Sequence, residues 1–275
     1  MSYAGKDNRT PHAFMQDQWQ PGLFYHVIGK AVTGAQLFRD EKDERYFIRH
    51  VLRFKLYHFL EILVYCLCGN HFHVVARTRS VAATRASLRT KPPKSRNLSD
   101  ELMLAGEIDF ATYAYHTVAG ATSGYARHFN HKYGREGRLF LRPTLHGLTD
   151  KGAPGELFSR RLGCYVGLNF VKHRMGRPGE NYFGSSLTNP QAGIVDHPLL
   201  LSLYGGEEAY HRFHNAYLRR FGHEFYGMDE DGFYAALRPR YYDKATRAWV
   251  EGEWAPDVTP PLTPPTAPPD HPPTA

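Results

Sequence analysis

Continuous apolar segments along this chain indicate strands, whereas apolar residues at helical spacing indicate helices. Residues 22–32 are rich in aromatic and β-branched side chains, a composition typical of a strand. Residues 61–76 form a second, strongly apolar segment that predicts strand structure, interrupted at Gly69 and Asn70. Residues 38–60 instead carry apolar side chains at helical spacing behind an acidic start, which predicts an amphipathic helix.

The rest of the chain is expected to be mainly helical before it ends in a tail. Residues 113–133 and 156–174 predict two helices, and the second of them follows a Pro-Gly breaker. Residues 191–250 predict a helical extension to which the sequence assigns no role. Residues 251–275 hold nine of the 19 prolines, so this Pro-rich tail is expected to be disordered.

Composition excludes several classes of protein. No apolar run reaches the roughly 18 residues that a membrane helix needs, so we expect no membrane association. The polar residues 1–18 predict a flexible N-terminus without a secretory signal. The three cysteines, Cys66, Cys68 and Cys164, form no CxxC pair. A disulfide framework or a structural zinc site is therefore not expected, and a cytoplasmic location fits best.

The charge of the chain favours a polyanionic partner. The net charge is +7, but residues 251–275 carry four acidic side chains and no Lys or Arg. The first 250 residues therefore hold 34 basic and 23 acidic side chains (27 less these four), a net of +11. Such an excess suits nucleic acid, although a merely basic soluble protein would have it too.

The basic side chains are densest in residues 77–98, which contain seven of them and no acid. This segment predicts an exposed basic loop, or a loop with a short helix, that contacts phosphates. A solvated insertion without a ligand is the alternative. The candidate nucleic-acid-binding residues of the segment are Arg85, Arg89, Lys91, Lys94 and Arg96.

A candidate metal motif lies at the end of the second apolar segment, in His71-Phe72-His73. Residues two apart on a strand point to the same face, so both imidazoles can bind one divalent ion while Phe72 packs into the core. Ionisable residues are unfavourable in such an apolar strand unless something requires them. With 16 histidines in 275 residues one such pattern is expected about once by chance, so two core or surface histidines are the alternative.

A second candidate element is the segment 164–172, which places Tyr165, Asn169 and Lys172 along one face of a helix. A tyrosine hydroxyl can act as a covalent nucleophile. Its ordinary pKa of about 10 means that a metal ion, or a cation such as Lys172, must help it at neutral pH. The alternative is a buried structural tyrosine.

In chain order, these motifs resemble those of the single-tyrosine HUH transposases, especially the REP-associated tyrosine transposases. HUH denotes histidine, a bulky hydrophobe and histidine, which residues 71–73 match, and the match as a whole covers residues 19–190. Phe170 departs from the family, which has a proline there. The other segments that carry the resemblance are residues 24–27 with 37–38, 65–70, 125–130 with 137–140, 165–169 and 182–186.

The resemblance implies an α+β, ferredoxin-like fold, an antiparallel sheet with helices on one face. It implies that His71, His73 and Asn169 bind Mg²⁺ or Mn²⁺ and that Tyr165 is the catalytic nucleophile. Lys172, on the face of the tyrosine, is a further candidate nucleic-acid-binding residue. The expected activity is nicking and joining of single-stranded or hairpin DNA through a 5′-phosphotyrosine. In the related transposases a dimer can place the tyrosine of one chain against the histidines of the other, and the sequence leaves a homodimer open.

Two other functions fit part of the sequence. A non-cleaving DNA-binding regulator derived from such a transposase would keep the basic surface, but the retention of Tyr165, His71 and His73 argues against it. A metal hydrolase would need carboxylates near the histidines, and residues 62–96 contain no Asp or Glu.

Overall fold

The computed structural model describes residues 19–141, 144–147, 162–173, 175, 182–187 and 193–221. The predicted flexible N-terminus, the Pro-rich tail and residues 222–250 of the predicted helical extension lie outside the described residues. The chain divides into two compact units, residues 1–196 and residues 197–275. None of the helices that the structure describes is long and apolar enough to cross a membrane.

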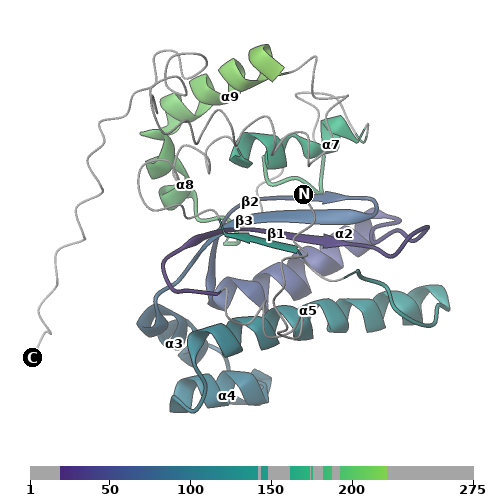
Figure 1. Ribbon diagram of the computed structural model, residues 1–275, viewed down its shortest axis with the longest axis vertical. Helices are drawn as coiled ribbons and strands as arrows, with labels where there is room; N and C mark the ends of the chain where they lie inside the picture. Colours follow the sequence, from purple (N-terminus) through teal and green to yellow (C-terminus); the bar gives the residue numbers. More distant parts are fainter. Residues whose placement is uncertain are drawn as a thin grey trace, which may run out of the picture. The chain divides into compact units, whose positions relative to one another are not determined.

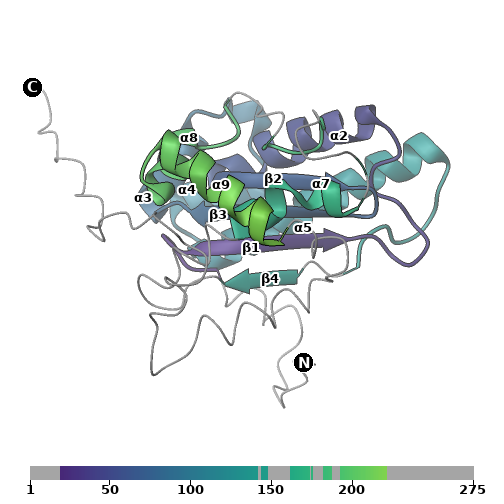
Figure 2. The same ribbon diagram turned by 90° about the horizontal axis from the view of Figure 1, so that it is seen from above.

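The first unit is built on an antiparallel sheet, which confirms the α+β class. Its strands are β1 (Phe24–Lys30), β2 (Leu60–Cys68), β3 (His71–Thr78) and β4 (Thr144–Gly147). They lie in the order β2-β3-β1-β4, and each neighbouring pair is antiparallel (Figure 2). The apolar segment 61–76 is therefore a hairpin, turned at Gly69 and Asn70 as its sequence predicts.

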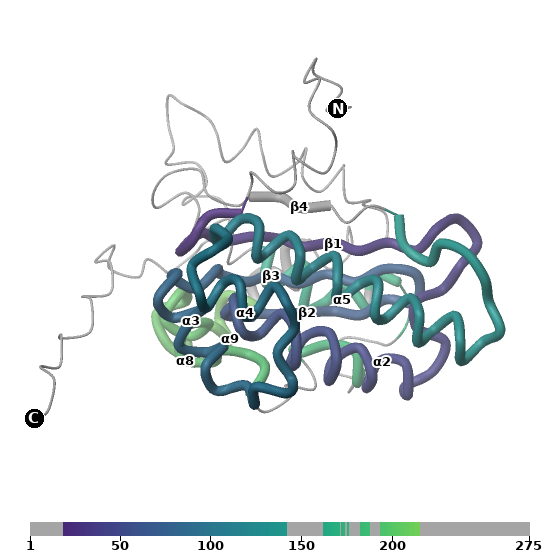
Figure 3. The backbone as a smooth tube through the Cα atoms, turned by 90° about the horizontal axis from the view of Figure 1, so that it is seen from below, coloured from purple at the N-terminus to yellow at the C-terminus, as the bar shows by residue number. Residues whose placement is uncertain are grey.

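One face of this sheet is apolar and is covered by α2 (Glu41–Phe47) and the long helix α5 (Phe110–Tyr133), as Figures 1 and 3 show. Phe72 points to this face, where its ring centroid lies 4.7 Å from that of Phe47. Phe47 in turn contacts Tyr125 of α5, with 5.1 Å between the ring centroids. The predicted core position of Phe72 is therefore confirmed. Gly29 lies opposite Phe72, and an added Cβ would come within 2.1 Å of the Phe72 ring.

The other face of the sheet carries the histidines and is covered by the helical residues 162–167 followed by α7 (Asn169–Lys172). A Cβ built on Gly167 would lie 3.5 Å from Val64 of β2, so this helix approaches the strand closely. Residues 162–172, which include Tyr165, are called the tyrosine helix below. The prediction of helices on one face thus describes α2 and α5 but not the tyrosine helix. The reason is that the side chains on both faces of the sheet are buried, so each face needs a covering layer.

The predicted helix 38–60 is wrong in its extent. Asp40 caps α2 by accepting a hydrogen bond from the backbone N–H of Asp43 at 2.9 Å, and α2 ends at Phe47. A π-helical turn, η1 (Ile48–Arg53), and a short 3₁₀ helix, η2 (Leu56–His58), follow it. The wider π turn adjusts the helical register while keeping its apolar side chains, Ile48, Val51 and Leu52, buried.

The basic segment 77–98 is more ordered than a loop. Ser80 caps α3 (Val81–Arg89) by accepting a hydrogen bond from the backbone N–H of Ala83. A 3₁₀ turn, η3 (Pro93–Ser95), leads into α4 (Leu98–Ala105), which has a capping box formed by Asn97 and Asp100. Both helices lie on the α5 side of the sheet (Figure 3).

A buried histidine links η2 to α3 and makes the stability of the protein depend on pH. His58 is buried, and its Nδ1 lies 2.9 Å from Ser87 Oγ. Burial, assisted by the charges of Lys91 and Arg79 and opposed by that of Asp100, lowers the pKa of His58 from 6.5 to about 4. Because the folded pKa lies below the unfolded one, the unfolded chain binds more protons, and stability falls as the pH drops from 6.5 toward 4.

We expect His58→Gln to reduce this pH dependence by about 1.4 kcal/mol per pH unit below the unfolded pKa. The measurement is the free energy of unfolding in urea at several pH values between neutral and mildly acidic. His116→Gln, which changes an exposed histidine of α5, is the control and should leave the slope unaltered. Equal slopes for wild type and His58→Gln would contradict the assignment.

The second unit is described by two helices, α8 (His197–Tyr204) and α9 (Glu207–Phe221). They pack through aromatic rings, with centroids 5.3 Å apart for Tyr204 and Phe213. Both helices fall within residues 191–250, and the rest of the predicted extension stays a prediction.

Candidate active site

The histidine face of the sheet brings together side chains from three adjacent strands. His71 and His73 lie on the same face of β3, with ring centroids 4.9 Å apart. In the sheet register, Cys68 of β2 is the partner of His71 and Cys66 that of His73. Cross-strand partners share a face, so each histidine has a thiol beside it.

The imidazole of His73 contacts a third histidine through its Nδ1 atom. His26 of β1 lies with its Nε2 2.9 Å from His73 Nδ1, and both rings are fully buried. Burial and the neighbouring imidazoles, His71 first, lower the pKa of His73 well below its ordinary value. His73 is therefore neutral at physiological pH, the state in which an imidazole can bind a metal ion. The contact with His26 sets the orientation of the ring, as hydrogen bonds behind metal-binding histidines do.

The ring of His71 is held in a similar way by its neighbour in the hairpin turn. His71 Nδ1 lies 2.7 Å from Asn70 Oδ1, which leaves Nε2 as the atom for a further ligand. Burial, together with the charges of His173, Lys30 and Lys172, lowers the pKa of His71 to about 3. Both histidines of the motif therefore have neutral rings whose orientation is fixed.

The tyrosine helix lies over this pair. The His73 and Tyr165 ring centroids are 6.2 Å apart, and the His71 and His173 centroids are 4.5 Å apart. Tyr165, Asn169 and His173 are spaced four residues apart, so they share one face of the helical segment. The two ring contacts thus align this face along β3, with Asn169 between the tyrosine and the last histidine.

Two polar side chains complete the arrangement around the tyrosine. Lys172 donates a hydrogen bond from Nζ to the Tyr165 hydroxyl at 3.0 Å. Asn169 is fully buried, and neither its Oδ1 nor its Nδ2 has a hydrogen-bond partner within the described part of the chain. A buried amide without partners costs about 1–3 kcal/mol, so this position calls for a bound water or ion.

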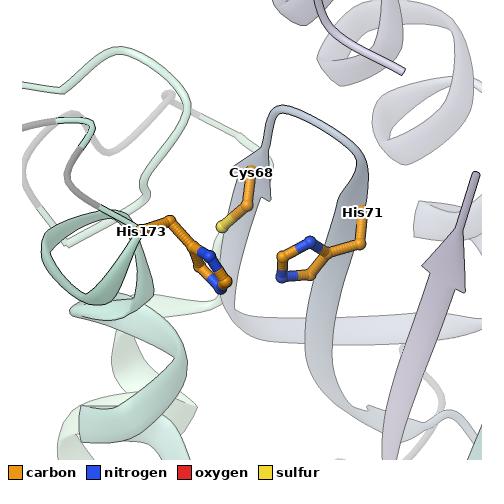
Figure 4. Close-up of side chains that lie close together, drawn as sticks. All are labelled: Cys68, His71 and His173. Atoms are coloured by element: carbon orange, nitrogen blue, oxygen red, sulfur yellow. The ribbon is translucent and has the colours of Figure 1, made fainter. Parts of the chain in front are cut away.

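The structure adds two residues that the sequence interpretation missed. These are Cys68 and His173: one potential ligand atom from each of them and one from His71 all lie within 4.8 Å of one another. Figure 4 shows the three side chains close together. His173 lies four residues after Asn169, so helical spacing alone could have added it to the row. Cys68 required the hairpin register, which places it opposite His71.

The predicted nucleic-acid-binding residues do not form one group. Lys172 lies at the tyrosine, whereas α3, η3 and α4, which hold or flank the other five, lie on the α5 side of the sheet. Arg85 donates to the Met103 carbonyl oxygen at 2.9 Å, and Arg96 donates to the Arg89 carbonyl oxygen at 3.1 Å.

Lys91 differs from its neighbours in the basic segment because it is bound to a buried acid. Its Nζ lies 2.5 Å from Asp100 Oδ2, and the two side chains are 10% and 2% exposed. Arg89 and Lys94 are exposed and form no ion pair with another described residue. Among the five basic residues predicted for this segment, Arg89 and Lys94 are thus the two with exposed side chains that no described acid holds.

Comparisons of the chain with models of protein families, with curated proteins and with solved structures found no match.

Proposed function

We propose that the protein nicks and joins single-stranded DNA through Tyr165 with the help of a divalent metal ion. The observation that carries this proposal is the alignment of the tyrosine helix along the histidine strand. A potential nucleophile lies beside the neutral imidazole of His73 and is hydrogen-bonded to a cation, and an unsatisfied amide lies on the same face of the helix. A purely structural tyrosine would need a hydrogen-bond partner such as Lys172, but it would not need the neutral imidazoles or the unsatisfied amide.

In the proposed reaction, the Tyr165 hydroxyl oxygen forms a bond to the phosphorus of a phosphodiester as the bond from phosphorus to the 3′ oxygen breaks. The product is a 5′-phosphotyrosine and a free 3′-OH, and the phenol proton leaves to solvent while the 3′ oxygen takes one up. The Lys172 ammonium favours the phenolate because it lies at hydrogen-bonding distance from the oxygen. Attack by a second 3′-OH reverses the step and joins two strands without ATP.

The residues present fit a divalent ion. His71 and His73 offer neutral imidazole nitrogens, and the buried Oδ1 of Asn169 lacks a hydrogen-bond partner among the described residues. These three would hold Mn²⁺, or Mg²⁺ less readily, because imidazole suits Mn²⁺ better than it suits Mg²⁺. When bound, such an ion would polarise the scissile phosphate and stabilise charge on the departing oxygen.

The topology supports the ferredoxin-like fold that the resemblance implies. The elements follow one another as β1, α2, β2, β3, α5 and β4, and the two central strands of the sheet are β3 and β1. A split β-α-β arrangement of this kind places the histidine strand in the middle of the sheet, where its backbone is held from both sides. We propose that hairpin or single-stranded DNA binds over this face, with a homodimer as one arrangement.

The burial of Tyr165 favours a second candidate function. Its side chain is only 2% exposed, so a phosphate reaches the hydroxyl only after a local opening. A protein in which this opening does not occur would bind DNA without cleaving it, as a regulator derived from a transposase. The covalent adduct separates the two functions.

The test uses the full chain and labelled single-stranded hairpins taken from around its gene, with Mn²⁺ or with EDTA. We expect a protein–DNA adduct that survives denaturation, forms only with the metal ion and leaves a free 3′-OH on the released strand. DNA binding without any adduct or nick, on every hairpin and with either ion, would overturn the proposal in favour of the regulator.

For the basic segment, we expect Arg89→Ala and Lys94→Ala each to weaken DNA binding at low salt. Each substitution should also reduce the slope of log affinity against log salt by about 0.7 for single strands, since one phosphate contact is lost. Fluorescence anisotropy at several salt concentrations measures both. Lys94→Arg keeps the charge and is the control, and a slope unchanged by either alanine would remove the segment from the DNA interface.

A further inference from the structure

The cluster of Cys68, His71 and His173 is a different donor set from the one used in the proposed reaction. Cys68 ends β2 and His71 begins β3, so both stand at the turn of the hairpin, while His173 follows α7. Figure 4 shows the sulfur atom and the two rings pointing toward one another. Cys68 and His71 are buried and His173 is exposed, so the cluster opens to solvent on the His173 side.

The hairpin fixes two of the three donors before any ion arrives. Cys68 and His71 are direct partners in the register of β2 and β3, joined by the two-residue turn at Gly69 and Asn70. The left-handed backbone of Gly69, with φ of 22°, allows this tight turn. The hydrogen bond to Asn70 holds the His71 ring with Nε2 available. The third donor, His173, is brought to 4.5 Å from the His71 ring by the tyrosine helix.

The chemistry of these donors selects the ion. A thiolate with two imidazoles suits Zn²⁺ and other soft or borderline ions, whereas Mg²⁺ prefers oxygen ligands. Around a tetrahedral zinc ion, ligand atoms lie about 3.4–3.7 Å apart, as follows from bond lengths of about 2.1–2.3 Å. The three atoms are already within 4.8 Å of one another, so binding needs a contraction of about 1 Å. The exposed His173 can supply it by a small side-chain movement.

We propose that Cys68, His71 and His173 form a binding site for a zinc-class divalent ion with one coordination position open to solvent. Three protein ligands and an open fourth position are the donor count of zinc sites that exchange a ligand, in contrast to the closed four-ligand sites of structural zinc. The site is independent of Tyr165 and would exist whatever the protein does to DNA.

The shared His71 links this site to the proposed reaction. His71 can bind only one ion through Nε2, so zinc at the Cys68 site withdraws one ligand from the set of His71, His73 and Asn169. Zinc would then inhibit manganese-dependent nicking. This consequence rests on the proposed function, whereas the binding site itself does not.

The test of binding uses the full chain, freed of metal with a chelator and titrated with Co²⁺ as a spectroscopic substitute for zinc. We expect one equivalent of Co²⁺ to produce a thiolate-to-cobalt charge-transfer band, and Zn²⁺ to displace it. Cys68→Ser should abolish the band. His173→Gln, at an exposed position where folding is not at risk, should weaken Co²⁺ binding by more than about 100-fold, beyond the effect of removing an outer partner.

Cys66→Ser is the matched control, because Cys66 is equally buried and its Sγ lies 3.5 Å from Cys68 Sγ, yet Cys66 is not among the three residues of the cluster. It should keep the band and the affinity. Circular dichroism verifies that each variant is folded. A cobalt complex without the thiolate band, loss of the band in folded Cys66→Ser, or unchanged affinity in His173→Gln would each overturn the site.

A second assay separates this inference from the proposed function. Zinc added to the manganese-dependent nicking reaction should inhibit the wild type, and Cys68→Ser should resist that inhibition. Absence of nicking together with an intact cobalt band would overturn the proposed function and leave the zinc site standing. Nicking without any cobalt band would overturn the zinc site alone.

Discussion

Tyr165→Phe is expected to abolish the covalent protein–DNA adduct and to reduce nicking by at least about 10⁴-fold, the scale seen when a catalytic nucleophile is removed. The substitution deletes only the hydroxyl oxygen that would attack phosphorus. The ring stays in its buried place beside His73, so the fold should lose about 1 kcal/mol, the net value of the hydrogen bond from Lys172. Gel analysis of the denatured reaction measures the adduct, and thermal unfolding measures the stability.

Tyr65→Phe is the matched control for this experiment. Tyr65 is also fully buried, but it is the register partner of Val74 and so faces α2 and α5, away from the histidines. Its hydroxyl has no hydrogen-bond partner among the residues described, so its removal should leave stability unchanged or slightly raised. Full adduct formation by Tyr165→Phe, or equal losses in both variants, would reject Tyr165 as the nucleophile.

Lys91→Met is expected to destabilise the fold by about 3 kcal/mol, the lower end of the range for breaking a buried ion pair. The variant leaves the Asp100 carboxylate buried without its cation. The lower end applies because Asp100 keeps two other donors, the Asn97 backbone N–H at 3.0 Å and the Tyr113 hydroxyl at 3.2 Å. Urea unfolding at neutral pH gives the free energy.

Lys94→Met is the control for this pair, three residues along the same basic segment. Lys94 is exposed, so the change in stability should stay within about 0.5 kcal/mol. On DNA affinity the order should reverse, with Lys94 contributing and Lys91 contributing little. Stability of Lys91→Met equal to that of the wild type would mean that Asp100 is satisfied without the lysine.

The metal site extends the same contrast between neighbouring residues. Cys66 and Cys68 lie two residues apart on β2 and are equally buried, yet only Cys68 belongs to the cluster with His71 and His173. The absence of CxxC spacing made a structural zinc site unexpected. The donor set in the fold combines a strand pair with a helix and so has no short spacing in the sequence.

The local parts of this protein were predictable because they depend on the backbone over a few residues. The aromatic and β-branched content of 22–32 and the apolar character of 61–76 predicted the strands, and alternation along a strand predicted the shared face of His71 and His73. Helical spacing predicted most of α5, which begins three residues earlier because Asp109 caps it. The same spacing predicted that Tyr165 and Lys172 share one face of a helix, and their side chains are hydrogen-bonded to each other.

Other features were decided only by packing between distant segments. The helix expected over 38–60 changes to a π turn at Ile48, which keeps Ile48, Val51 and Leu52 in the core. Basic residues of similar sequence context separate into an ion-paired Lys91 and an exposed Lys94, according to where a buried Asp100 lies. His173 meets His71 across about a hundred residues of chain, since periodicity fixes which face a side chain takes and tertiary packing fixes what that face meets.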